Sequence, residues 1–522
     1  MTSRSGTAAP RTAEKKDRLS VRAGGVLLPV SSLPSPYGIG NLGKDAFRFV
    51  DFLEQAGQRY WQILPIGPTG YGDSPYQSFS AFAANPYFID PDQLVEQGLL
   101  SEEEIARFPF GDDPRQIDYG LLFENRFALL RLATDRISDG DGAFAAFQRE
   151  NAEWLDDYAL FMALKKEYGM VSFQEWPDEL RLRGPAAMDA ARKRLAAEVR
   201  FWKAAQYLFF AQWGALREYA NRKGVAIIGD LPIYVSPDSA DLWAHSELFQ
   251  LNSDRRPKEV AGCPPDAFTK DGQLWGNPLY DWEKHAATGY RWWIRRLQSA
   301  AKVYDVVRID HFRGFAGYYA VPASHTNAKS GRWREGPGAG FIDTVKKELP
   351  SLSIIAEDLG YLTDDVRALL AESGFPGMKV LQFAFDSREQ SDYLPHNYRR
   401  DCVVYTGTHD NTTTQDWQFS APRKDAAFAR RYLGITGRGD FAGAMIRAAQ
   451  GSVANTCVIP LQDYLRLGAE ARINTPGTAY GNWRWRVTRE ELSPRLARRM
   501  WRIAQTYGRS PVRPAEGPDE KE

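Results

Sequence analysis

The stretch Val306–Phe312 (VVRIDHF) sets the pattern from which the fold of this chain can be predicted. A short apolar run that ends in polar residues is typical of a strand buried on both faces, as in a parallel sheet. Seven further runs repeat the pattern. They are 25–33 (GVLLPVSSL), 60–66 (YWQILPI), 225–235 (VAIIGDLPIYV), 353–360 (SIIAEDLG), 378–385 (MKVLQFAF), 402–410 (CVVYTGTHD) and 457–465 (CVIPLQDYL).

Helical patterns separate most of these runs. Residues 44–56 (KDAFRFVDFLEQA) place Phe47, Val50 and Leu53 on one stripe, and Gly57 then ends the predicted helix. Similar patterns occupy residues 201–223, 291–302 and 363–371. Eight strands that alternate with helices favour an α/β fold, a (β/α)8 TIM barrel.

The predicted barrel spans residues 21–508 and carries two long departures from the repeat. The helix-rich segment at about 91–200, between the second and third strands, is expected to form an insertion subdomain. Residues 236–290, rich in Pro, Gly and Trp, are expected to form a long active-site loop region, because loops of that length usually shape a binding site. Residues 1–20 and 509–522 are predicted to be disordered tails.

Composition excludes several classes of protein. The 522 residues hold 66 Lys+Arg and 66 Asp+Glu, and this balance argues against nucleic acid as a partner. No apolar run is long enough to span a membrane, and the first residues lack the apolar core of a secretory signal. The 3 cysteines lie far apart, so we expect no disulfide framework and a cytoplasmic location. The sequence does not indicate the oligomeric state.

Carboxylates end four of the predicted strands. They are Asp230, Asp310, the pair Glu357-Asp358, and Asp410. Because barrel enzymes carry their active sites at the carboxyl ends of the strands, four acidic ends point to one catalytic rim. Each one alone could equally cap the following helix.

Spacing suggests roles for some of these groups. Arg308 and Asp310 lie two residues apart and so point to the same side of a strand, where the guanidinium would keep the carboxylate ionised. A buried structural ion pair is the alternative. Glu357 and Asp358 point to opposite sides, and spacing cannot choose which of them faces the site as a proton donor.

Other chemistry has little support. The chain has 6 His in no metal-binding spacing, although His409-Asp410 leaves a metal-dependent hydrolase as a minor alternative. Nucleotide-binding glycine motifs and the GxSxG elbow are absent. We therefore expect no metal and no cofactor. Tyr76, in a loop after the second strand, could stack on a ligand or simply form a turn.

The motifs at these strand ends resemble those of amylomaltase, the 4-alpha-glucanotransferase or disproportionating enzyme of the α-amylase superfamily. The matching segments are 72–77 (GDSPYQ), 229–235 (GDLPIYV), 272–280 (GQLWGNPLY), 308–314 (RIDHFRG), 356–360 (AEDLG) and 407–411 (GTHDN). The resemblance runs from about residue 24 to 486, with the motifs in the expected order.

The resemblance implies that Asp310 is the nucleophile, Glu357 the general acid/base and Asp410 the transition-state-stabilising carboxylate. It also implies the sugar contacts, with Trp275 on the acceptor side. The implied sugar-binding residues are Tyr76, Asp230, Arg308, His409, Trp275, Asp386 and Asn482.

The implied reaction moves segments of α-1,4-glucan between maltodextrin or starch chains by a retaining double displacement with a covalent glucosyl-enzyme. Glucan oligosaccharides and polysaccharides are then the expected partners, as donor and as acceptor. A retaining α-glucan hydrolase of the same superfamily is the alternative. A glucan-binding protein without catalysis is disfavoured by the presence of all three carboxylates.

Overall fold

The eight predicted strands close into one parallel barrel. The computed structural model describes residues 18–138, 140–265, 270–360, 362–388 and 391–511. Around the barrel the strand order is β1-β12-β11-β10-β9-β6-β3-β2, and every described pairing between these strands is parallel. The strands are β1 (Ala23–Leu27), β2 (Tyr60–Gln62), β3 (Ala226–Leu231), β6 (Val306–Ile309), β9 (Ser353–Ala356), β10 (Gly377–Val380), β11 (Cys402–Tyr405) and β12 (Thr456–Pro460). The (β/α)8 prediction is confirmed.

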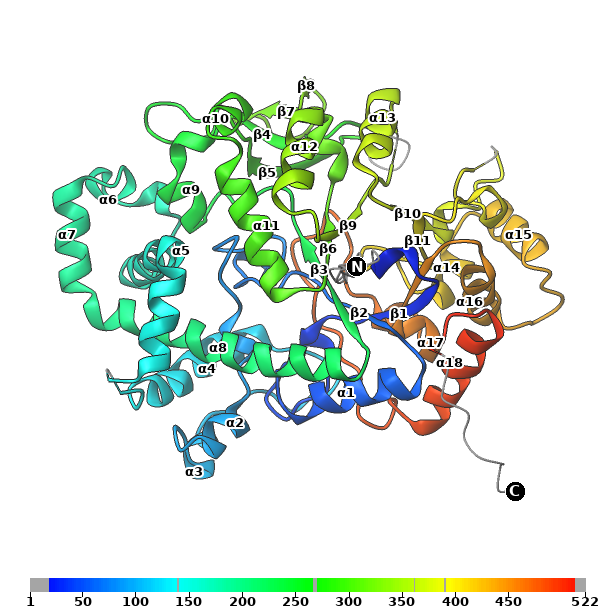
Figure 1. Ribbon diagram of the computed structural model, residues 1–522, viewed down its shortest axis with the longest axis horizontal. Coiled ribbons are helices and arrows are strands. Elements are labelled where there is room, and N and C mark those ends of the chain that lie inside the picture. Colours follow the sequence, from blue (N-terminus) through cyan, green and yellow to red (C-terminus); the bar gives the residue numbers. More distant parts are fainter. Residues whose placement is uncertain (1–17, 139, 266–269, 361, 389–390, 512–522) are drawn as a thin grey trace, which may run out of the picture.

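Helices cover the outside of this barrel (Figure 1). The helix predicted over 44–56 is α1, and the other three predicted helices are α8, α11 and α13. These elements are α1 (Lys44–Gln55), α8 (Ala196–Arg222), α11 (Arg291–Val303), α12 (Gly338–Glu348), α13 (Asp364–Ser373), α14 (Thr414–Ser420), α15 (Arg423–Tyr432), α16 (Phe441–Gly451), α17 (Leu461–Leu465) and α18 (Pro494–Thr506). Both faces of each barrel strand are buried, because side chains fill the barrel interior on one side and the helices pack on the other.

Helices also fill the long connection between β2 and β3. They are α2 (Pro91–Glu96), α3 (Glu102–Ile105), α4 (Tyr119–Thr134), α5 (Gly142–Glu167), α6 (Asp178–Arg181) and α7 (Pro185–Arg194). Figure 1 shows α4 to α7 gathered to one side of the barrel, while the long α8 runs from this group to lie beside α1. One continuous helix therefore ties the helix-rich segment to the barrel wall.

The excursion after β3 contains structure that the sequence did not suggest. It holds α9 (Ala240–Ala244), β4 (Glu259–Cys263), β5 (Gln273–Pro278) and α10 (Trp282–Ala287). With β7 (Gly317–Pro322) and β8 (Arg332–Glu335), β4 and β5 form an antiparallel sheet of order β5-β4-β7-β8. The segments after β3 and after β6 thus share one small sheet, which rigidly holds the residues that follow both strands.

The predicted tails lie mostly outside the described residues, which begin at 18 and end at 511. Inside that range the prediction is wrong at both ends. Leu19, in the short 3-10 helix Arg18–Ser20, is buried. Arg509 is fully buried, and its guanidinium donates to the carbonyls of Ala23, Gln450 and Asn455. The charged residues of this segment led us to predict that it is exposed to solvent. Arg509 can be buried because these carbonyls satisfy the hydrogen bonds of its guanidinium.

In the part of the chain that the structure describes, no helix has the length and apolar character needed to cross a membrane.

Candidate active site

The acidic strand ends come together at one end of the barrel. In the strand register Asp230 lies opposite Arg308, and Ile309 lies opposite Ala356, so Asp310 and Glu357 follow at the next position of neighbouring strands. Neighbouring strands lie about 4.8 Å apart, which keeps the two acids within the reach of one substrate atom.

Arg308 fixes two of the carboxylates. Its Nη1 donates to both oxygens of Asp230, at 2.6 and 2.7 Å, and its Nη2 donates to Asp310 Oδ1 at 2.9 Å. Burial by itself would lower the pKa of Arg308, but the charges of Asp230 and Asp310 outweigh it and raise that pKa well above its ordinary value. The side chains of Asp230 and Arg308 are almost inaccessible, whereas that of Asp310 is 30% exposed. The arginine thus holds an accessible carboxyl group in one direction, as a nucleophile requires.

Glu357 is held by backbone donors. Its Oε2 accepts from the N–H of His311 at 2.6 Å, and its Oε1 accepts from the N–H of Leu359 at 2.8 Å. His311, which donates the first of these bonds, has a φ of 54°, a left-handed conformation that is uncommon outside glycine. Burial and, after it, the negative charge of Asp310 raise the pKa of Glu357 to about 7, against the opposing charge of Arg308. Such a carboxyl group can give and take a proton near neutral pH.

Asp358, which residue spacing alone could not separate from Glu357, has a different environment. Its Oδ1 accepts from the backbone N–H of Met378 on β10 at 2.6 Å, and the residue is 4% exposed. Asp358 therefore braces the junction of β9 and β10, and Glu357 is the acid that faces Asp310.

Asp410 lies on the loop after β11 and is the most exposed of the three catalytic candidates, at 46%. Its Oδ1 accepts from Asn474 Nδ2 at 2.6 Å and lies 3.3 Å from His409 Nε2. The loop itself is clamped from α17, where Asp463 accepts from the hydroxyls of Thr406 and Thr414, at 2.5 and 2.6 Å. The two threonines flank the loop, so this clamp fixes its ends.

Aromatic side chains line the same end of the barrel. The hydroxyl of Tyr76 donates to Asp230 Oδ2 at 2.7 Å, and its ring stacks on His409 with centroids 5.1 Å apart. Trp483, which the sequence analysis missed, packs against both rings. Trp275 stands edge-on to His311, with centroids 4.7 Å apart. Trp275 and Tyr76 thus flank the carboxylates from the segments after β3 and after β2.

The remaining two predicted sugar ligands have other contacts. Both carboxylate oxygens of Asp386 accept from Arg388, at 2.8 and 2.6 Å. The Asn482 amide accepts from the N–H of Thr475 and donates to Thr478, so it closes the segment 475–482 on itself. Sugar binding by Asp386 and Asn482 stays a prediction.

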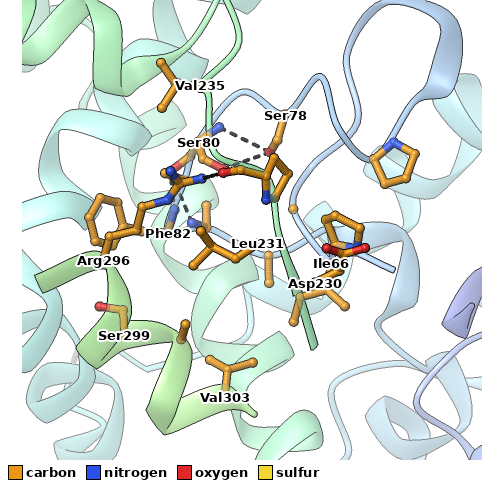
Figure 2. A pocket seen from close by; sticks show the side chains of 18 of the residues that line it. Ile66, Ser78, Ser80, Phe82, Asp230, Leu231, Val235, Arg296, Ser299 and Val303 are labelled. Atoms are coloured by element: carbon orange, nitrogen blue, oxygen red, sulfur yellow. Dashed lines mark hydrogen bonds between the residues drawn. The ribbon is translucent and has the colours of Figure 1, made fainter. Parts of the chain in front are cut away.

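A cavity of about 80 Å³ lies next to Asp230 and is lined in part by Asp230 and Tyr76 (Figure 2). Its walls come from the segment after β2, the end of β3, and α11. Arg296 reaches across from α11 and donates to the carbonyls of Pro232 and Ile233, at 2.6 and 3.0 Å. The size of this cavity suits a few water molecules rather than a sugar chain.

The family model for 4-alpha-glucanotransferase matches residues 28–492. The chain belongs to the 4-alpha-glucanotransferase family. A 4-alpha-glucanotransferase of Thermus thermophilus is 48% identical over 500 residues, covering 94% of this chain and 99% of that protein. The one from Clostridium butyricum is 46% identical over 483 residues, covering 92% and 99%. An amylomaltase from Streptococcus agalactiae, solved in complex with acarbose, superposes with a TM-score of 0.91 at 40% identity, covering 94% and 100%.

These comparisons confirm the family and the fold that the resemblance to amylomaltase implied. The residues that sequence reasoning missed around Asp410 are Arg472, Asn474 and Trp483. They lie in a loop after the last barrel strand, and no apolar run or motif in the sequence indicates that they belong to the site.

Proposed function

We propose that this chain is a 4-alpha-glucanotransferase that moves segments of α-1,4-glucan from one chain to another. The observation that carries the proposal is the pair formed by Asp310, held by the Arg308 guanidinium, and Glu357, whose pKa burial raises to about 7. Two carboxyl groups in such different states on neighbouring strands are what a retaining glycoside reaction needs.

In the first step, Glu357 gives its proton to the glycosidic oxygen while an Asp310 oxygen attacks the anomeric carbon. The C–O bond to the leaving chain breaks, and an ester between the glucan and Asp310 forms. Asp410 stabilises the positive charge that develops on the sugar ring between these states. Arg308 keeps the attacking carboxylate ionised and aligned throughout.

In the second step, the 4-hydroxyl of an acceptor glucan replaces the leaving chain. Glu357, now ionised, takes the hydroxyl proton, and the new C–O bond releases Asp310. Trp275, beside His311, offers an aromatic face for this acceptor. We propose that the segments after β2 and β3, which carry Tyr76 and Trp275, favour sugar over water by covering the ester.

The donor sugar is proposed to bind between Tyr76, Asp230, Arg308 and His409. The ring of Tyr76 gives an apolar surface that suits the C–H face of glucose, and the charged groups give hydrogen bonds to its hydroxyls. Cys402 and Cys457 are buried thiols that form no disulfide, which suits a reducing compartment, and we propose a cytoplasmic location.

Purified protein incubated with maltotriose tests the proposal. We expect glucose or maltose together with a ladder of longer maltodextrins, separated by chromatography. Glucose and maltose without longer products would identify a hydrolase instead. Asp310→Asn is the control, since it removes the attacking oxygen while keeping its shape, and it should lower turnover by several orders of magnitude with folding intact.

A further inference from the structure

One contact in the site has no part in the mechanism above. Asn474 Nδ2 donates to Asp410 Oδ1 at 2.6 Å, as short as the contact between Arg308 and Asp230. We infer that Asn474 is a positioning residue, which fixes the Asp410 carboxylate for the transition state. This inference rests on the proposed function, because it acts through the role assigned to Asp410.

The backbone around Asn474 is tied to the Asp410 loop by further bonds. The N–H of Asn474 donates to the carbonyl of His409 at 3.1 Å, and Arg472 Nη2 donates to the carbonyl of Asp410 at 2.8 Å. Arg472 Nε also donates to the carbonyl of Asn474 at 2.7 Å, so one guanidinium bridges the two segments. The base of the segment is closed by the N–H of Trp483 on the carbonyl of Ile473, at 2.7 Å. The amide is therefore presented to Asp410 by a braced loop.

The need for such a donor follows from the exposure of Asp410. Its side chain is 46% exposed, so packing restrains χ1 and χ2 less than it would in a buried side chain. A hydrogen bond from a held amide selects one rotamer and leaves Oδ2 for the substrate. A neutral donor also preserves the negative charge that must stabilise an oxocarbenium-like sugar, whereas a guanidinium at this place would offset it. Asp310, the proposed nucleophile, is therefore paired with the Arg308 cation, whereas Asp410 is hydrogen-bonded to the neutral Asn474 amide.

Asn474→Ala removes the donor and should lower kcat about 10- to 100-fold, the usual range for losing a hydrogen bond to a charged group. KM for maltotriose should change less than kcat, because the bond matters most where charge develops. Thr478→Ala is the matched control. Thr478 is an exposed member of the same loop; its hydroxyl donates to the carbonyl of Thr475 and accepts from the amide of Asn482, and none of these hydrogen bonds reaches Asp410.

Asn474→Asp gives a readout that loop damage would not produce. It sets a second carboxyl group against Asp410, where His409, Tyr76 and Arg472 are the other ionisable neighbours. At high pH the two carboxylates repel. At lower pH one of them holds a proton and can donate it to the other, since like charges this close cannot both ionise easily. The activity of this variant relative to wild type should therefore rise at least several-fold from pH 8 to pH 5.5.

The outcomes separate the two claims. A normal kcat in Asn474→Ala overturns the inference, and so does an equal loss in Thr478→Ala, or a pH-independent ratio for Asn474→Asp. Asp410→Asn distinguishes these failures from failure of the proposed function. If it keeps wild-type turnover, the role of Asp410 is wrong. If it is inactive while Asn474→Ala is normal, only the positioning role is lost.

Discussion

The raised pKa of Glu357 has a consequence for the pH dependence of the first chemical step. The group must carry its proton to release a sugar leaving group, and its pKa is about 7 rather than the ordinary value near 4.5. Because the protonated fraction falls about tenfold for each pH unit above the pKa, kcat/KM for maltotriose at pH 9 should be about one hundredth of its low-pH plateau. An ordinary glutamic acid would place this decline near pH 4.5.

A donor that needs no proton provides the control. With an α-maltosyl fluoride, fluoride leaves without general acid catalysis, so the decline centred at pH 7 should disappear from kcat/KM. Glu357→Gln should accordingly lose activity on maltotriose by several orders of magnitude, yet still form the glycosyl-enzyme from the fluoride. An identical inflection for both donors would refute the assignment of Glu357 as the acid.

Three further predictions concern Arg308, Asp358 and His285, of which the last is a fully buried residue of α10. Arg308→Lys keeps the charge but cannot hold Asp230 and Asp310 at once, so kcat should fall about 100-fold or more while circular dichroism stays native. Asp358→Ala leaves the buried N–H of Met378 without its acceptor and should lower the free energy of unfolding, measured in urea, by about 1–3 kcal/mol. A shifted pH profile of kcat/KM in this variant would contradict the structural role of Asp358. Burial lowers the pKa of His285 to about 4, so between pH 6.5 and 4 the unfolded chain binds a proton that the folded chain does not. Stability is then lost as pH falls, by about 2 kcal/mol at pH 5, and His285→Phe should remove most of this acid sensitivity in thermal unfolding.

Much of the barrel could be predicted because its signal is local. Each barrel strand is a mostly apolar run of three to six residues whose faces are largely buried, so the requirement for burial is visible in consecutive residues. The small sheet β5-β4-β7-β8 carries no such signal. Its strands lie on segments separated by the whole of α11 and β6, and one of them, β8, is largely exposed. Its existence depends on pairing between distant segments, which local pattern does not encode.

The candidate site likewise has features that local sequence predicts and features that depend on distant segments. The sequence by itself determined which acids end the barrel strands, because a parallel barrel brings all carboxyl ends to one rim whatever the loops do. Residue spacing left the choice between Glu357 and Asp358 open and the resemblance implied Glu357; only the tertiary structure gives the physical difference, because it shows which backbone N–H each carboxyl group meets. It alone also revealed Asn474 beside Asp410, 64 residues away in the chain. The positions of the strands in the sequence follow from burial of consecutive residues, but the direction and protonation of a carboxyl group are set by neighbours that the fold brings in from elsewhere in the chain.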